Sequence, residues 1–294
     1  MDEDGIYAQV LYPNLGGFGS GKFIALDDPE LRLTCVQAYN DFLTDWLQIA
    51  PRRFIPITAL PFWDRDASLA EIQRCAARGH KGILMVGEPD QFGQPHLADP
   101  YWDPVWACAQ DAGLPINFHI GNSDAEMVPE PGYAGTGQLT HFAKLAVSAF
   151  LNNSRHIMEV ITAGVCHRFP RLDFVSVESG VGWIPFLLEA LDWQWANYGV
   201  WRERPEMDLK PSEYFRRQIY SCFWFEEGSA LAAVEAFQDN ILYETDYPHP
   251  TCQHPGPATP AQFPRDYATG ALSSLDDATL QKVLHDTAAS LYGL

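Results

Sequence analysis

Three residues of the kinds that bind divalent metal ions stand at the ends of apolar runs in this chain. They are His119, Glu178 and Asp246, and each closes a short segment with the character of a buried strand. One imidazole and two carboxylates can hold a divalent ion and leave coordination positions open for substrate or water. Each residue alone has an ordinary explanation, because a carboxylate after a strand can cap a helix and a single histidine is often structural. Three at equivalent positions favour metal binding or acid–base chemistry.

The elements that must position these residues follow a repeated order of apolar run, turn and amphipathic helix. The expected strands cover residues 6–11, 54–60, 81–86, 115–119, 173–178, 219–223 and 241–246. The expected helices cover residues 29–49, 68–77, 104–112, 140–163, 184–196 and 276–291. Near-continuous apolar strands that alternate with helices indicate a parallel sheet covered by helices.

Seven such units without a break in composition favour one α/β domain over residues 1–294, a TIM-type (β/α)8 barrel with seven of its eight strands. In this fold catalytic groups lie at the carboxyl ends of the strands, which is where the three candidate residues stand. A nucleotide-dependent doubly wound sheet is the weaker interpretation. The glycine-rich residues 15–21 follow the first strand but do not form G-x-G-x-x-G or a P-loop. We expect them to form a flexible loop on the active face.

Composition excludes several classes of partner. The 294 residues include 38 acidic and 19 basic ones, a formal net charge of -19, with no basic run. We therefore expect neither nucleic acid nor an anionic membrane surface as a partner. No apolar stretch reaches the roughly 18 residues of a transmembrane helix, and the acidic N-terminus lacks a signal-peptide pattern. The six cysteines are widely separated, so we expect reduced thiols and a cytoplasmic location.

Two blocks of the sequence resemble the amidohydrolase-related family. One covers residues 164–185 and includes CHRFPRL and VESGVGWIP, and the other covers residues 241–249, ILYETDYPH. The resemblance is to the branch that contains aminocarboxymuconate-semialdehyde decarboxylase and the aromatic-acid decarboxylases, and it extends over essentially the whole chain. It implies a metal-dependent TIM barrel, in agreement with the order of elements.

The resemblance also implies roles for four residues. His119 and Asp246 correspond to metal ligands, and Asp246 serves in proton transfer as well. Glu178 occupies the position where the decarboxylases carry a histidine that contacts metal-bound water or substrate. His249 is similar to a residue common after the aspartate in uncharacterised relatives. The expected catalytic group is therefore Asp246, Glu178 and His249, and the expected metal is zinc, with manganese as the alternative.

One departure from the family concerns its first strand, which ends in a His-x-His or Glu-x-His pair that supplies two metal ligands. No H-x-H occurs in this sequence. We therefore expect the seven strands to correspond to strands two to eight, and the N-terminal segment with the first strand to be absent.

The expected function is that of a metal-dependent decarboxylase or hydrolase acting on a small aromatic or unsaturated carboxylic acid. The alternative is an inactive or truncated barrel that lacks two metal ligands. We expect a small-molecule substrate and allow for a homo-oligomer. Long loops near the active face carry His141 and His254, either of which can contact substrate. Four tryptophans near strand ends can contact a flat acid or pack barrel against helix, and they are Trp63, Trp102, Trp183 and Trp224.

Overall fold

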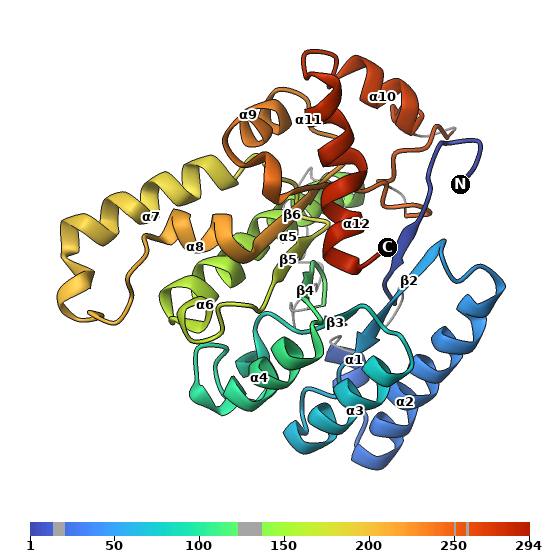
Figure 1. Ribbon diagram of the computed structural model, residues 1–294. Coiled ribbons are helices and arrows are strands. Elements are labelled where there is room, and N and C mark those ends of the chain that lie inside the picture. The colour runs from blue at the N-terminus through green and yellow to red at the C-terminus, as the bar shows by residue number, and fades with distance from the viewer. Residues whose placement is uncertain (14–20, 123–136, 250, 257–258) are drawn as a thin grey trace.

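The chain forms seven parallel strands surrounded by helices (Figure 1). The computed structural model describes residues 1–13, 21–122, 137–249, 251–256 and 259–294. The strands are β1 (Gln9–Leu11), β2 (Phe54–Ala59), β3 (Gly82–Leu84), β4 (Ile116–His119), β5 (Phe174–Val177), β6 (Ile219–Phe223) and β7 (Ile241–Tyr243). Every expected strand is present.

The first strand begins three residues later than the sequence pattern predicts, at Gln9. The carbonyl groups of Ile6 and Tyr7 instead accept hydrogen bonds from the Arg53 side chain. The Arg53 side chain therefore binds the carbonyl groups of Ile6 and Tyr7, which a neighbouring strand would otherwise bind. Pairing with β2 begins only after these residues, at Gln9.

The strands follow one another in chain order, from β1 to β7, and all neighbouring pairs are parallel. Among the described residues, β1 pairs only with β2, and β7 pairs only with β6. The sheet is therefore a curled barrel that lacks one strand between β1 and β7. This confirms the prediction of a TIM-type barrel with seven of eight strands.

The helices connect the strands and cover the outside of the sheet, and α7 and α8 project to the left in Figure 1. The helices are α1 (Gly21–Ile24), α2 (Pro29–Trp46), α3 (Arg65–Ala77), α4 (Asp103–Ala112), α5 (Gln138–Thr162), α6 (Val165–Arg168), α7 (Ile184–Tyr198), α8 (Pro211–Gln218), α9 (Gly228–Phe237), α10 (Pro264–Gly270), α11 (Asp277–Gln281) and α12 (Thr287–Tyr292). A π-helical turn, η6 (Lys282–Asp286), joins the last two, so the expected C-terminal helix is continuous. Short 3₁₀ turns are η1 (Leu47–Ile49), η2 (Pro89–Phe92), η3 (Pro100–Trp102), η4 (Val200–Arg202) and η5 (Gln238–Asn240).

Local sequence explains several helix boundaries. Asp28 and Asp64 cap the first turns of α2 and α3 by accepting the N–H groups of Leu31 and Ala67. Helix α4 ends at Gly113, whose φ of 66° lies in the left-handed region that glycine adopts without strain. No helix among the described residues is long and apolar enough to cross a membrane. All six cysteines carry free thiols.

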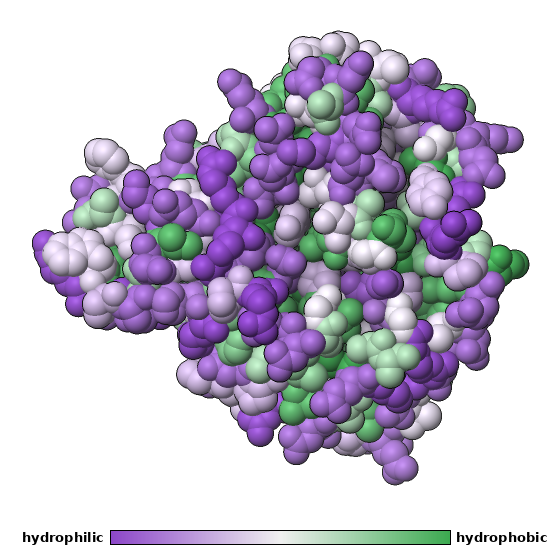
Figure 2. All heavy atoms as spheres, in the orientation of Figure 1, coloured by the Kyte–Doolittle hydropathy of each residue, from purple (hydrophilic) through white to green (hydrophobic). Residues whose placement is uncertain are grey.

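Alternate residues of the strands face two apolar layers. The outer layer lies between strands and helices and contains the largest fully buried side chains, among them Trp102, Trp106, Phe118, Phe174 and Phe223. The inner layer lines the barrel interior with two smaller clusters, which are centred on Ile55, Ile57 and Leu84 and on Val175, Val177, Cys222 and Leu242. The outer surface is mostly hydrophilic in the view of Figure 2, with hydrophobic residues gathered near the centre and right of that face.

The C-terminal helix α12 reaches the barrel interior directly. The Tyr292 hydroxyl donates a hydrogen bond to Asn117 Oδ1 at 2.7 Å, and the Tyr12 hydroxyl donates to the same oxygen at 2.9 Å. Leu291 packs against both inner clusters. In a closed parallel barrel a strand separates the covering helices from the interior. Here the helix contacts the interior on the side of the missing strand.

Candidate metal and catalytic site

The four residues expected to form the site meet at the carboxyl end of the sheet. His119 Nε2 lies 3.2 Å from Glu178 Oε2. His249 Nδ1 lies 3.2 Å from Asp246 Oδ2 and 3.7 Å from Glu178 Oε1. Residues separated by up to 130 positions in the sequence therefore form one cluster, because parallel strands bring their carboxyl ends to one edge.

The two carboxylate residues share an unusual backbone conformation. Glu178 has a φ of 55° and Asp246 a φ of 54°, and no other non-glycine residue that the structure describes has a positive φ. A non-glycine residue in this region costs roughly 1–3 kcal/mol and persists where surrounding contacts enforce it. Both turns therefore hold a carboxylate in a direction that a relaxed backbone would not give.

His119 is oriented by its own strand end. Its Nδ1 lies 2.7 Å from the Ile120 carbonyl oxygen, so the Nδ1–H donates there and Nε2 faces Glu178. Burial lowers the pKa of His119 to about 4, which keeps the imidazole neutral. The Tyr12 ring lies against it, with 4.9 Å between the ring centroids. His119 therefore offers an unprotonated nitrogen to the site.

Three carboxyl groups crowd the same end of the barrel. Burial, followed by the charges of Asp246 and Glu244, raises the pKa of Glu178 to about 9. Burial, followed by the charge of Asp246, raises the pKa of Glu244 to about 8. Burial also raises the pKa of Asp246, and hydrogen bonding to Thr251 opposes that rise. A cation beside these three carboxyl groups would favour their ionised forms and lower their pKa values.

The donor atoms fit a divalent metal ion. One ligand atom each from Glu178, Asp246 and His249 lie within 4.8 Å of one another, and this is the metal-capable group that the described part of the chain contains. Two carboxylate oxygens and one imidazole nitrogen suit ions such as Mn²⁺ and Zn²⁺. The expected ligand pair was His119 and Asp246. In the structure the potential ligand atoms nearest to one another come from Asp246, Glu178 and His249. The His119 imidazole lies next to this group, in contact with Glu178.

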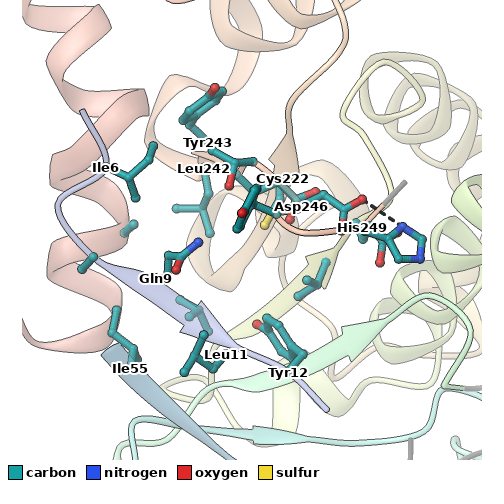
Figure 3. Close-up of a pocket in the computed structure, with 18 of the residues that line it drawn as sticks. Ile6, Gln9, Leu11, Tyr12, Ile55, Cys222, Leu242, Tyr243, Asp246 and His249 are labelled. Atoms are coloured by element: carbon teal, nitrogen blue, oxygen red, sulfur yellow. Dashed lines mark hydrogen bonds and ion pairs between the residues drawn. The ribbon is translucent and has the colours of Figure 1, made fainter. Parts of the chain in front are cut away.

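The site opens into a cavity of about 850 Å³ that runs between β1 and β7. Figure 3 shows Gln9, Leu11 and Tyr12 on one wall and Leu242, Asp246 and His249 on the other, with the contact between Asp246 and His249 dashed. The cavity is polar at the site and mostly apolar elsewhere. Sequence reasoning missed several polar residues that line it, among them Tyr12, Cys222 and Glu244. Glu244 had a usable signal, because it lies two residues before Asp246 and so faces the same side of the strand.

The aromatic residues at the cavity differ from those expected. None of the four tryptophans lines it among the described residues, because Trp102 and Trp224 are fully buried and Trp63 and Trp183 pack against the outer layer. Six other aromatic residues do, namely Tyr7, Tyr12, Phe150, Tyr243, Tyr247 and Tyr292. Trp63, Trp102 and Trp183 therefore pack between the strands and the covering helices, which was the other role expected for the tryptophans.

The loop expectations have mixed outcomes. His141 lies in helix α5 and not in a loop, so that expectation was wrong. Neither His141 nor His254 lines the cavity among the described residues. Most of the glycine-rich residues 15–21 lies outside the described residues.

The barrel fold and the donors at its strand ends are those expected of a metal-dependent hydrolase or carboxy-lyase. The chain belongs to the amidohydrolase family, whose sequence model matches residues 21–294. The two sequence blocks carried the resemblance to this family, and the barrel is the fold that the resemblance implied.

Individual relatives are distant but cover most of the chain. Gamma-resorcylate decarboxylase from Rhizobium sp. (strain MTP-10005) is 24% identical over 270 residues, which span 86% of this chain and 76% of that protein. The 2-amino-3-carboxymuconate-6-semialdehyde decarboxylase of Dictyostelium discoideum is 24% identical over 281 residues, which span 90% of this chain and 68% of that protein. A structure of 5-carboxyvanillate decarboxylase from Novosphingobium aromaticivorans, a variant with bound manganese and a nitrobenzoic acid, superimposes with a TM-score of 0.77 at 21% identity. It covers 100% of this chain and 79% of that one.

Proposed function

We propose that this protein is a metal-dependent decarboxylase of aromatic carboxylic acids. The observation that carries the proposal is the convergence of Glu178, Asp246 and His249 within 4.8 Å at the carboxyl end of a parallel barrel. The family and the decarboxylases among its relatives support it. The comparisons do not support the alternative of an inactive remnant.

Glu178, Asp246 and His249 would hold the ion, with His119 as an additional nitrogen donor. Manganese is the first metal to test, since it is bound in structures similar to this one, and zinc is the alternative. A divalent ion at this position supplies a Lewis acid that binds and polarises the oxygens of a substrate carboxylate.

Decarboxylation of an aromatic acid needs a proton at the ring carbon, after which the bond to the carboxylate breaks and CO₂ leaves. Asp246 is our candidate for this proton transfer. Its Oδ2 accepts a hydrogen bond from the Thr251 hydroxyl at 2.7 Å and contacts His249 Nδ1 at 3.2 Å. His249 is exposed and so connects the carboxyl group with solvent. Catalytic Asp246 and His249 then form a path for the proton, while Glu178 stays directed at the ion.

The test combines metal analysis with an assay of two acids. The protein is loaded with Mn²⁺, its metal content is measured, and CO₂ release from gamma-resorcylate and 5-carboxyvanillate is followed. Asp246→Asn is expected to lower both metal affinity and turnover by more than about 100-fold. This exceeds the loss of about 10–100-fold that is typical when a residue that only orients a metal ligand is replaced. The matched control is Asp266→Asn on an exposed turn of α10. A manganese-loaded protein that hydrolyses esters or amides and releases no CO₂ would contradict the proposal.

We also propose that residues 1–294 form a single barrel domain and that the cavity between β1 and β7 is the place of the absent strand. Residues 4–13 line one side of that cavity and residues 242–249 the other, so it follows two strand edges. Fusing the first strand of gamma-resorcylate decarboxylase to residue 1 should raise the melting temperature and the affinity for Mn²⁺. A fusion with the same residues in shuffled order is the control, and equal effects of both fusions would refute this assignment.

A further inference from the structure

Behind the turn that carries Glu178 lies a second buried carboxylate, that of Glu226. It follows β6 on the neighbouring loop and is 8% exposed. Its Oε1 accepts hydrogen bonds from the backbone N–H groups of Val181, at 2.9 Å, and Gly182, at 2.8 Å. Glu226 is not part of the metal-capable group. It contacts the segment that follows Glu178 and not the site itself.

The turn closes tightly on this carboxylate. Gly180 has a φ of 69°, and a Cβ built there would lie 2.9 Å from Glu226 Oε1 and 3.0 Å from Oε2. A Cβ on Gly182 would lie 3.3 Å from Oε1. The positive φ of Glu178 and that of Gly180 therefore belong to one short turn, residues 178–182, whose far end is fixed by two hydrogen bonds to Glu226.

Glu226 is itself anchored, and its segment contacts both site turns. The Tyr267 hydroxyl donates to the Glu226 carbonyl. The Trp224 indole N–H donates to the Thr251 carbonyl at 3.0 Å, and the Thr251 hydroxyl in turn donates to Asp246. Of the residues that follow β6, Glu226 thus contacts the turn of Glu178 and Trp224 contacts the loop of Asp246.

We propose that Glu226 is a positioning residue, which holds the 178–182 turn so that the Glu178 carboxylate points at Asp246 and His249. Hydrogen bonds to a carboxylate are stronger than those to a neutral acceptor, so the two at Glu226 can offset the strain of the positive φ at Glu178. Without them the turn can relax to a negative φ and the carboxylate leaves the group. The proposal depends on the proposed function only where Mn²⁺ affinity is measured.

Three variants test this role. Glu226→Leu removes the oxygen that accepts the Val181 and Gly182 N–H groups. Glu226→Asp draws that oxygen back by one methylene group, and Glu226→Gln keeps one acceptor oxygen at the same place. We expect the first two to raise the dissociation constant for Mn²⁺ by about 10–100-fold, the loss typical of residues that orient metal ligands. Glu226→Gln should stay within about threefold of the parent protein by the same measure. Glu71→Leu removes a buried carboxylate that binds Asn40 and Arg74 far from the site, and it controls for loss of stability alone.

A second measurement needs no metal. Hydrogen exchange at the Val181 and Gly182 amides should accelerate in Glu226→Leu and Glu226→Asp, while the Ala67 amide, bound by Asp64, should not change. If the parent protein binds no Mn²⁺ but exchange accelerates as expected, the proposed function fails and the positioning role stands. Unchanged exchange, or an unchanged Mn²⁺ affinity in a folded Glu226→Leu protein that binds the metal, would overturn the role of Glu226.

In a Glu178→Ala background, Glu226→Leu should cause no further loss of Mn²⁺ affinity, because its effect passes through Glu178. An additional loss equal to that seen in the parent background would mean that Glu226 acts on stability generally, and would also overturn the proposal.

Discussion

The turns that present Glu178 and Asp246 have nearly the same backbone angle but different support. Glu178 is 6% exposed, and its turn is held by a carboxylate from another loop. Asp246 is held within its own loop, where its carbonyl accepts the His249 N–H and its side chain accepts the Thr251 hydroxyl. His249 and Thr251 are exposed. The turn of Glu178 is buried over residues 178–181 (the buried turn), whereas the turn of Asp246 (the exposed turn) is flanked by residues that water reaches.

The largest contrast is expected between Glu178→Gln and Asp246→Asn in the metal-free protein. A carboxyl group whose pKa rises from 4.5 to about 9 on folding favours the folded state at low pH. That contribution is lost as pH increases from 4.5 to 9. Glu178→Gln should therefore raise the free energy of unfolding at pH 7 by about 3 kcal/mol and flatten its decline over this range.

Asp246→Asn should raise the free energy of unfolding by less than Glu178→Gln does, because the Asp246 charge is a smaller cause of the raised pKa of Glu178 and Glu244 than burial is. Asparagine tolerates a positive φ, and the Thr251 hydroxyl keeps an acceptor. Urea denaturation at pH 5, 7 and 9 measures both variants. Equal stabilisation by the two changes would show that the buried and the exposed turn do not differ as described.

A pair of glycine variants separates backbone strain from contact with Glu226. Gly180→Ala places a Cβ against the Glu226 carboxylate, whereas Gly93 has a similar φ of 74° and open space around it. The left-handed conformation alone costs roughly 1–2 kcal/mol. We expect Gly180→Ala to lower the free energy of unfolding by about 1–2 kcal/mol more than Gly93→Ala, because overpacking adds to the strain. Thermal denaturation of both variants is the measurement, and equal losses would count against a tight turn.

The smallest effect is expected at the exposed turn. Thr251→Val removes the hydrogen bond to Asp246, so the pKa of that carboxyl should rise further, in the direction in which burial already moves it. The limb of the pH–rate profile that reports Asp246 should shift to higher pH, and the Mn²⁺ dissociation constant should increase by less than about tenfold. Thr269→Val on α10 is a control remote from this loop. A profile identical to that of the parent protein would place the Thr251 contact outside the proton path.

Apolar patterning predicted every strand and three of the residues that meet at the site, His119, Glu178 and Asp246, because strand-end positions in a parallel barrel are fixed by chain order. His249 came from the family resemblance and not from the pattern. The pattern did not predict Glu226 or Asn117. The roles of these residues come from contacts across about 45 and 175 positions, which periodicity does not encode. Nor did it predict the positive φ of Glu178 and Asp246, since both residues normally avoid that region. The pattern also assigned the wrong aromatic residues to the cavity. Tryptophans near the strand ends were the candidates there, but they are buried or pack against the outer layer, and most of the aromatic residues that line the cavity are tyrosines.

The hydrogen bond between Asn117 and Tyr292 also bears on how the chain acquires its structure during translation. The two residues are 175 positions apart, so at about 5–20 residues per second the ribosome needs roughly 9–35 seconds to add the second after the first. During that interval β5 is added beside β4, and Tyr12 can already bind the amide oxygen of Asn117. The side of the barrel interior that Tyr292 covers therefore stays open until residue 292 has been added to the chain.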